Sequence, residues 1–164
     1  MADLKLINSF SELVGSLEKA GVPIGSDDTQ QLLQIPIKAP PLESVVYMRW
    51  VNQPPYLSMV LPVLDGISDA RLGAIESAVC RANNGIPLPG FGIDYNHHAV
   101  VFKVSVPVAD GVPSATLDTL IQGIVTSSRN CMMAFAKVAK EDAAPETIAQ
   151  LIDEWVASDR TRKG

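Results

Sequence analysis

The chain has 164 residues, a length that suits about one domain with a single sizeable core. Its composition of 47% hydrophobic and 19% charged residues excludes a disordered chain. The formal net charge of -5 argues against a nucleic-acid-binding surface, because binding to phosphates depends on Lys and Arg side chains.

The start of the chain, MADLKLINSF, contains no long apolar run and no cleavage signature. No stretch of the sequence approaches the roughly 20 apolar residues that a membrane-spanning helix needs. Cys80 and Cys131 lie far apart, at helical positions that point into a core, and we expect buried free thiols there and not a disulfide or a metal pair. These features predict a protein of the reducing cytoplasm with no membrane partner.

The N-terminal part of the chain is predicted to form a helix, a linker and a strand. Ser9 and Glu12 have the spacing of a capping box, which starts a helix that Gly21 ends. The segment VPIGSDDT is predicted to be a solvated, turn-rich linker. The strand runs from about Gln31 to Lys38, and Pro36 within it indicates a sheet edge or a strand end, because proline cannot donate to a ladder.

Two further strands, residues 44–51 and 56–63, are predicted to form a hairpin around the loop NQPP. In this register the large side chains pair across the strands on one face: Trp50 with Leu57, Met48 with Met59, and Val46 with Leu61. Such agreement is what fixes the register of a hairpin. The opposite face is unusually apolar for a solvent-exposed one and carries Val45, Tyr47, Arg49, Ser58 and Val60.

The stretch from Ser68 to Val108 is the best-determined part of the predicted fold. Ser68 is the expected N-cap of a helix with an apolar stripe, and Asn84-Gly85 supply its C-terminal stop. The segment GIPLPGFG then leads into a second hairpin with Asn96-His97 as its turn. The predicted cross-strand pairs are Tyr95 with His98, Ile93 with Val100, and Phe91 with Phe102.

A long helix is predicted to begin near Ser114, and Gly123 with the polar run Thr126–Asn130 weakens its apolar stripe enough to allow a bend. A final helix is predicted from Pro145, a favoured first-turn residue, and its apolar face includes Trp155. We therefore expect an α+β fold with a mostly antiparallel five-stranded sheet and the element order α-βββ-α-ββ-α-α. Residues 1–164 are expected to form a single domain, with the helix from about residue 145 as an addition.

The sequence offers no convincing catalytic, cofactor or metal site. His97 and His98 are adjacent, so on a strand they would point to opposite faces and could not readily chelate one metal. Asp27-Asp28 and Glu141-Asp142 are interpreted as solvated loops, because acid-base chemistry needs carboxylates held in a cleft. GFG at residues 90–92 leads into a strand and lacks the Lys-Ser/Thr ending of a phosphate loop. We predict no enzyme and no cofactor.

The segment AIESAVCRANNGIPLPGFGIDYNHHAVVFKVSVPVADGVPSATLDTLIQGIV resembles the YbjN-like bacterial proteins. The matching residues of this pattern are Asn83, Asn84, Phe91, Asp94, Pro107 and Gly111. The order of elements is similar to the type III secretion chaperone fold, to which the YbjN-like proteins are related. The chain departs from the pattern in its proline-rich KAPPLE and NQPP loops and in the Pro145 helix. The resemblance implies a non-enzymatic, dimer-forming module that holds a partner polypeptide.

The apolar second face of the sheet is the candidate partner-binding surface, with Tyr47 as its anchor. Its residues are Val45, Tyr47, Arg49, Val60, Val101 and Lys103. The Pro145 helix or a second copy of the chain would instead cover this face if it were structural. A homodimer is also expected, through the central helix or the Pro145 helix, because the chain has more apolar stripes than one sheet can cover.

Two different functions stay open on the sequence. The first is a small-molecule-sensing or enzymatic domain, which a closed pocket lined by convergent polar groups would favour. The second is a structural assembly subunit, which a stable stoichiometric complex would favour over transient partners. An open apolar groove would favour the binding module.

Overall fold

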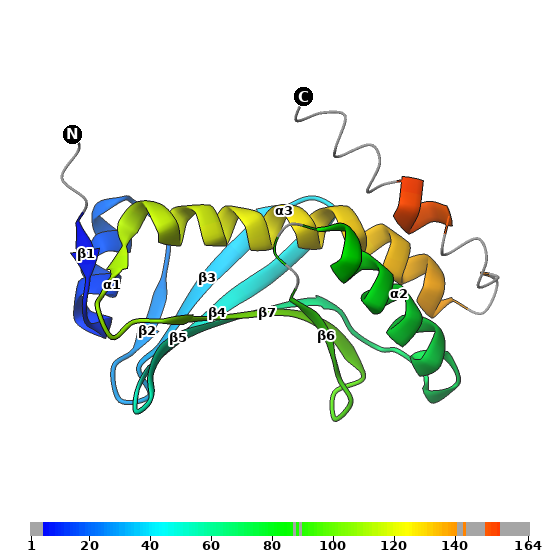
Figure 1. The fold of residues 1–164 in the computed structure, drawn as a ribbon, viewed down its shortest axis with the longest axis horizontal. Helices are drawn as coiled ribbons and strands as arrows, with labels where there is room; N and C mark the ends of the chain where they lie inside the picture. Colours follow the sequence, from blue (N-terminus) through cyan, green and yellow to red (C-terminus); the bar gives the residue numbers. More distant parts are fainter. Residues whose placement is uncertain (1–4, 87, 89, 141–142, 144–149, 155–164) are drawn as a thin grey trace.

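The computed structural model describes residues 5–86, 88, 90–140, 143 and 150–154 (Figure 1). Its main sheet has six antiparallel strands in the order β2-β3-β4-β5-β7-β6, and β1 pairs with β8 in a separate two-stranded sheet. The elements are β1 (Leu6–Ile7), α1 (Phe10–Lys19), β2 (Gly25–Asp27), β3 (Leu32–Ala39), β4 (Leu42–Asn52), β5 (Pro55–Leu64), α2 (Leu72–Gly85), β6 (Phe91–Asp94), β7 (Ala99–Pro107), β8 (Val112–Pro113) and α3 (Ser114–Ala139). The predicted α+β fold with a mostly antiparallel sheet is confirmed.

The prediction of five strands is wrong, because β2 adds a sixth strand to the main sheet. β2 lies within the segment predicted to be a solvated linker, and its Gly, Ser and Asp residues have low strand propensity. It forms because it pairs with β3, with Gly25 opposite Gln34 and Asp27 opposite Leu32. Pairing with a neighbouring strand therefore outweighs local preference at this position.

The predicted hairpin registers are confirmed, except that Tyr95 and His98, predicted as a cross-strand pair, lie in the turn beyond the last pair, Asp94 with Ala99. In the first hairpin, Trp50 lies opposite Leu57 and Met48 opposite Met59, and the connection is tighter than predicted because Asn52 pairs directly with Pro55. In the second hairpin, Phe91 lies opposite Phe102 and Ile93 opposite Val100. Each register brings the large side chains of its hairpin to one face of the sheet.

Pro36 lies where β3 is an edge strand, as its missing N–H group predicted. β2 pairs with β3 only from Leu32 to Gln34, so residues beyond Gln34 have no partner on that side. The hydrogen bond from the Trp50 N–H to the Gln31 carbonyl fixes which residues of β3 face β4. In this alternation the backbone nitrogen of Pro36 points away from β4, so the proline removes no ladder hydrogen bond.

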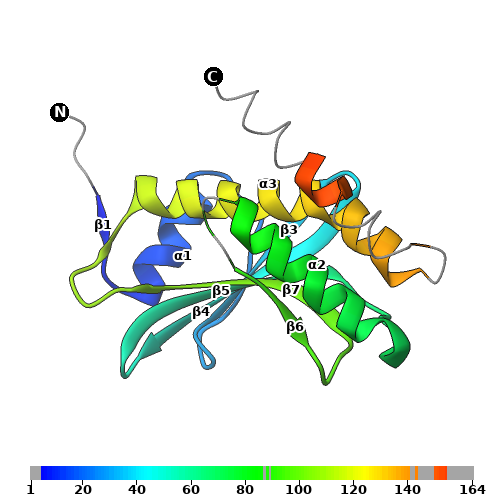
Figure 2. The ribbon, with the colours of Figure 1, turned by 45° about the vertical axis from the view of Figure 1, so that its right-hand side comes forward.

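All the described helices lie on the same face of the main sheet (Figures 1 and 2). α3 crosses the sheet and contacts β3, β4 and β5, and α2 packs beside α3 and β6. The Phe91 ring meets Phe102 and Phe135 edge to face, with ring centroids 4.7 and 5.0 Å apart, and Phe135 belongs to α3. This aromatic cluster fixes the long helix to the sheet.

The ends of the helices differ in part from the predicted ones. The Ser9 hydroxyl accepts the Glu12 N–H, as predicted, but the Glu12 carboxylate accepts the backbone N–H of Asn8 and not that of Ser9. Ser68 precedes a short 3-10 turn, Asp69–Arg71, and makes no side-chain cap, so its predicted role as the N-cap of α2 is wrong. The chain from Ser114 to Ala139 forms one uninterrupted helix.

The segment from Ile67 to Arg71 ties two distant parts of the molecule together. The Arg71 guanidinium donates to the Val138 carbonyl in the last turn of α3, where a cation is favourable, and to the Ala143 carbonyl beyond the helix. The Ile67 N–H donates to the His98 carbonyl, and the Ile67 carbonyl lies 3.0 Å from His98 Nδ1. One short connection thus contacts both a hairpin of the sheet and the end of the long helix.

The predicted C-terminal helix and cysteines have mixed outcomes. Residues 150–154 are helical and Ile152 is buried, whereas Pro145 and Trp155 lie outside the described residues. Cys131 is buried, and burial raises the pKa of its thiol to about 12. Cys80 is exposed, so its predicted burial is wrong. The buried stripe of α2 consists of other positions: Ile75, Ala78, Val79 and Ala82.

Candidate functional site

The candidate site is the outer face of the sheet, the face opposite the helices. Its central row crosses four strands, because Gln34 pairs with Tyr47, Tyr47 with Val60, and Val60 with Lys103. The neighbouring rows place Pro36 opposite Val45, Pro62 opposite Val101, and Arg49 opposite Ser58. The six residues predicted from the sequence therefore occupy adjacent positions on β4, β5 and β7.

The centre of the outer face is an apolar strip made of Val45, Tyr47, Val60 and Val101. Tyr47 is 37% exposed, and the three valines are half-buried. In the part of the chain that the structure describes, no helix covers this strip, because the helices all lie on the other side of the sheet (Figures 1 and 2). Covering by a helix of the same chain is therefore not observed among the described residues.

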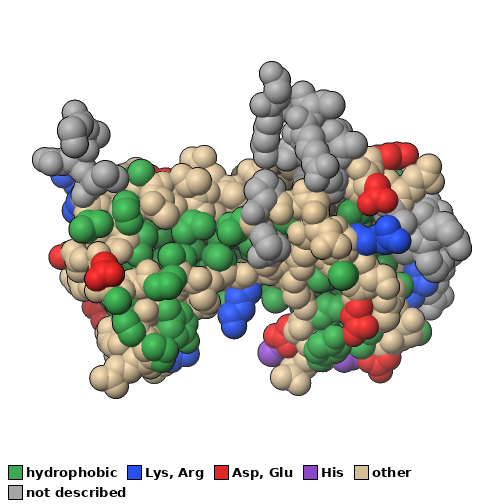
Figure 3. All heavy atoms as spheres, viewed as in Figure 1, with side chains coloured by type: hydrophobic (Ala, Val, Ile, Leu, Met, Phe, Trp, Pro, Cys, Tyr) green, Lys and Arg blue, Asp and Glu red, His purple; other side chains and the backbone are tan. Residues whose placement is uncertain are grey.

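The outer face lies on a hollowed side of the molecule. In the ribbon, the tips of the β4–β5 and β6–β7 hairpins project beyond the middle of the sheet (Figure 1). The space-filling view shows a notch between two lobes at this margin, with basic side-chain atoms in the notch (Figure 3). The hairpin tips thus form the walls of the hollow, and the strands form its floor.

The charges of the outer face are arranged unevenly. Arg49 and Lys103 are exposed beside the apolar strip, and neither forms an ion pair with any described residue. The carboxylates at the rim have partners within the chain: Asp27 accepts the Gln30 N–H at 3.0 Å, and Asp94 lies 2.8 Å from His97 Nδ1. The hydrogen bond from His97 is the main cause that lowers the pKa of Asp94.

Asn83 covers the start of the free edge of β6, a role that the sequence alone did not reveal. Its side-chain amide donates to the Phe91 carbonyl at 2.9 Å, and its side-chain oxygen accepts the N–H groups of Gly90 and Phe91 at 3.1 and 3.0 Å. Gly90 must be a glycine, because a Cβ there would lie 2.6 Å from the Lys103 carbonyl oxygen. The asparagine step and the GFG turn are therefore explained by packing and edge protection.

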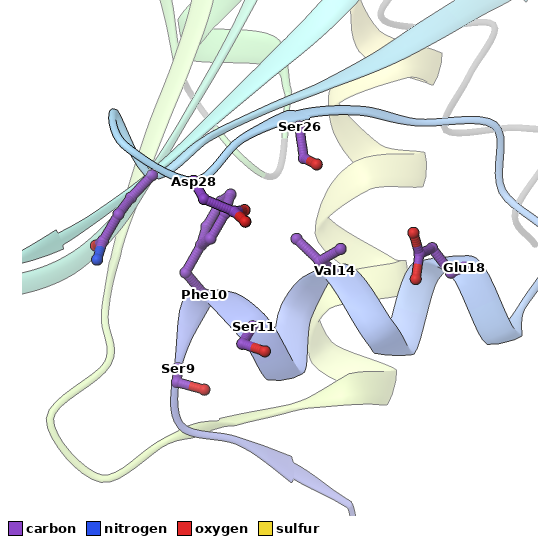
Figure 4. A pocket seen from close by; sticks show the side chains of 8 residues that line it. Ser9, Phe10, Ser11, Val14, Glu18, Ser26 and Asp28 are labelled. Atoms are coloured by element: carbon purple, nitrogen blue, oxygen red, sulfur yellow. The ribbon is translucent and has the colours of Figure 1, made fainter.

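A separate pocket of about 510 Å³ lies between α1 and the β2–β3 connection (Figure 4). Its floor includes Phe10 and Val14, which point from α1 toward β2 (Figure 4). Its polar lining is Ser9, Ser11, Glu18, Ser26, Asp28 and Gln31. Most of these polar side chains are exposed, so this pocket does not enclose convergent polar groups as a small-molecule site would.

The predicted histidine pair lies at the tip of the β6–β7 hairpin. His97 is exposed, and the half-buried His98 adopts a left-handed backbone conformation with φ of 49°. Within the described ranges, no three His, Cys, Asp or Glu side chains are close enough together to hold a metal ion. No helix among the described residues is both long and apolar enough to cross a membrane.

Gln34 and Pro62 also belong to the outer face but were not predicted from the sequence. Pro62 follows Val60 by two residues in the same strand, so the period of two could have placed it there. Gln34 required the pairing of β3 with β4, which depends on the tight turn that sets Ala39 opposite Leu42. The signal for that pairing lies in the KAPPLE turn.

The comparisons with known proteins support one class of fold. The chain has a YbjN-like fold of the kind found in type III secretion chaperones. It resembles YbjN of E. coli, with a TM-score of 0.51 and 11% sequence identity over 94% of this chain and 96% of that one. It also resembles a chain of the HopA1–SchA chaperone–effector complex, with a TM-score of 0.54 and 15% identity over 77% of this chain and 95% of that one. Neither a protein-family model nor a curated protein sequence matches the chain.

Proposed function

We propose that this protein is a non-enzymatic binding module, chaperone-like or regulatory, that holds a partner polypeptide on the outer face of its sheet. The observation that carries this proposal is the strip of Val45, Tyr47, Val60 and Val101, which no described helix covers. Contiguous exposed apolar surface of this kind commonly marks a site where another molecule binds. Tyr47 is the anchor, because an aromatic ring with one polar tip suits a partly wet contact.

The two solved structures that the chain resembles support a protein-binding role. One of them comes from a chaperone–effector complex, and the other, YbjN, is described as a candidate transcription regulator. Sequence identities of 11 and 15% indicate a shared fold alone. The role, as a chaperone or as a regulator, is therefore a proposal for this chain. We also propose a cytoplasmic protein with a single domain over residues 1–164.

The proposal is tested by capturing partners from the source cell with the wild-type protein and with Tyr47→Ala, followed by quantitative mass spectrometry. Tyr47→Ala is expected to weaken the capture of a specific partner by about 1–3 kcal/mol, the range of interface hot spots. Met133→Ala is the matched control, because Met133 is 53% exposed on α3, on the other side of the sheet. This control variant is expected to capture the partner as the wild type does.

Thermal unfolding of the same variants separates binding from folding. If Tyr47→Ala lowers the stability by as much as it lowers the capture, Tyr47 is a core residue and the binding-face proposal is wrong. A partner that all three proteins capture equally would also contradict it. A stable complex of fixed stoichiometry, in place of exchanging partners, would instead indicate a structural assembly subunit.

We also propose that the protein forms a homodimer, with α2 or the C-terminal helix as the contact. The protomer has a mass of 17.5 kDa, so a dimer is resolved easily by light scattering. A dimer is expected at micromolar concentration. A monomer alone at that concentration would contradict this part of the proposal.

A further inference from the structure

We propose that the segment held on the outer face is an acidic amphipathic α-helix, whose carboxylates pair with Arg49 and Lys103. This inference rests on the proposed function and adds the conformation and the charge of the partner. It follows from three features of the described residues: short or interrupted sheet edges, a hollowed apolar strip, and two cations that form no ion pair with a described residue.

The short and interrupted edges disfavour a partner that adds a strand to the sheet. A bound strand needs a row of free N–H and C=O groups along an edge. At the β6 edge, Asn83 occupies both groups of Phe91, and β6 is only four residues long. At the other edge, β2 has three residues, and beyond it the edge of β3 contains Pro36, which has no N–H. Side chains of the outer face therefore offer a partner a larger contact than the backbone groups of the edges do.

A helix is the conformation that suits such a surface, because it satisfies its own backbone hydrogen bonds. An extended peptide on the face would leave its N–H and C=O groups against apolar side chains without partners. The strip formed by Tyr47, Val60 and Val101 crosses β4, β5 and β7, which is roughly 10 Å at the usual spacing between strands. A helix that lies across the strands would cover this strip with about two turns, because each turn rises about 5.4 Å. The hollow between the hairpin tips provides the matching groove (Figure 3).

The charge of the partner is inferred from the positions and the partners of the charged side chains on the outer face. The rim carboxylates Asp27 and Asp94 already accept hydrogen bonds within the chain, and Glu43 lies directly opposite Lys38. Arg49 and Lys103, nearer the centre, form no ion pair with a described residue. In a chain of net charge -5, these two residues place positive charge directly beside the apolar pair: Arg49 is two residues from Tyr47 on β4, and Lys103 lies opposite Val60. Complementary carboxylates on the partner would both steer and orient it.

The positions of the two cations also predict the spacing of the acidic residues. Arg49 and Lys103 are separated by two strand spacings and two residues along the strands, which is roughly 12 Å between their Cα atoms. Seven residues of an α-helix span about 11 Å. The partner is thus expected to carry Asp or Glu about two helical turns apart, with apolar residues between them at helical spacing.

The experiment selects phage-displayed random peptides, about four helical turns long, on three versions of the full-length protein: wild type, Tyr47→Ala, and the double variant Arg49→Glu/Lys103→Glu. Wild type is expected to enrich peptides with two acidic positions about seven residues apart around an apolar stripe. The double variant is expected to enrich Lys or Arg at those positions and to bind the wild-type selected peptides roughly 3- to 30-fold more weakly. Circular dichroism should show that a selected peptide becomes helical on binding. Thermal unfolding confirms that each variant is folded.

The outcomes separate this inference from the proposed function. Peptides that need Tyr47 but show no acidic enrichment, or that bind in an extended form, overturn the inference and leave the proposed function standing. Failure to select any peptide that depends on Tyr47 overturns both. The inference is also overturned if Arg49 and Lys103 instead bind a short single-stranded RNA. Self-association that the double variant abolishes would likewise contradict it, because a second copy would then occupy the face.

Discussion

The two faces of the main sheet are built by alternate residues of the same strands but meet different surroundings. On the inner face, Leu33, Met48 and Met59 are fully buried beneath the helices. On the outer face, Tyr47 and Val60 lie beside them in sequence and remain exposed or half-buried. The inner apolar groups are explained by the fold, whereas the outer ones are not needed to seal the core. This difference makes the outer face the candidate for binding.

The largest expected effect is the loss of stability on truncating the core between the inner face and the helices. Phe135→Ala removes a fully buried ring that packs against Phe91. The free energy of unfolding is expected to fall by about 3–5 kcal/mol, measured by denaturant unfolding. Tyr47→Ala, on the outer face, is expected to lower it by about 1 kcal/mol or less. Similar losses for the two variants would remove the distinction between the faces.

A smaller effect is expected at the edge where the two faces meet. Asn83→Ala removes three hydrogen bonds and leaves the peptide groups of Phe91 without their partner. A loss of about 1–3 kcal/mol in the free energy of unfolding is expected, together with faster hydrogen exchange at the Phe91 amide. Asn84→Ala is the matched control, because it makes the same change in α2 at an exposed neighbouring position. Equal effects of the two substitutions would show that Asn83 does not protect the edge.

The smallest effect concerns the rim of the outer face and depends on pH. The pKa of Asp94 is lowered by its hydrogen bond with His97, so the ionised carboxylate stabilises the folded state. This contribution is present above the ordinary value of 3.8 and is lost as the pH falls through the lowered pKa. The melting temperatures of wild type and Asp94→Asn should therefore differ at neutral pH and converge in acid.

Local pattern was sufficient for most of the fold. The alternation in residues 44–63 and 91–102 predicted both hairpin registers, because only one register brings all large side chains to a single face. β2 could not be predicted in this way, since Gly25, Ser26 and Asp27 carry no apolar pattern and become a strand only beside β3. The predicted burial of Cys80 was wrong because its helical position lies off the buried stripe of α2, which faces α3 and β6.

The sequence predicted which residues share the outer face, but it could not predict whether helices cover that face. Alternation alone placed Tyr47 and Val60 together, and the registers extend that row to Lys103. Whether a helix covers the row depends on where the helices pack, which no periodicity within a strand can indicate. The hydrogen bonds of Asn83 to Phe91 join an α-helix to a sheet edge across the GFG turn, so they too were visible only in three dimensions.

The connection through Ile67 and Arg71 has a mechanical consequence. Its bonds hold the β6–β7 hairpin, which is one wall of the outer hollow, and the C-terminal end of α3, which lies in the inner layer. The helix layer cannot slide along the sheet at this end without breaking the bonds of either His98 or Arg71. A force on the C-terminal end of α3 therefore reaches the wall of the hollow through this short segment as well as through the contact between Phe135 and Phe91.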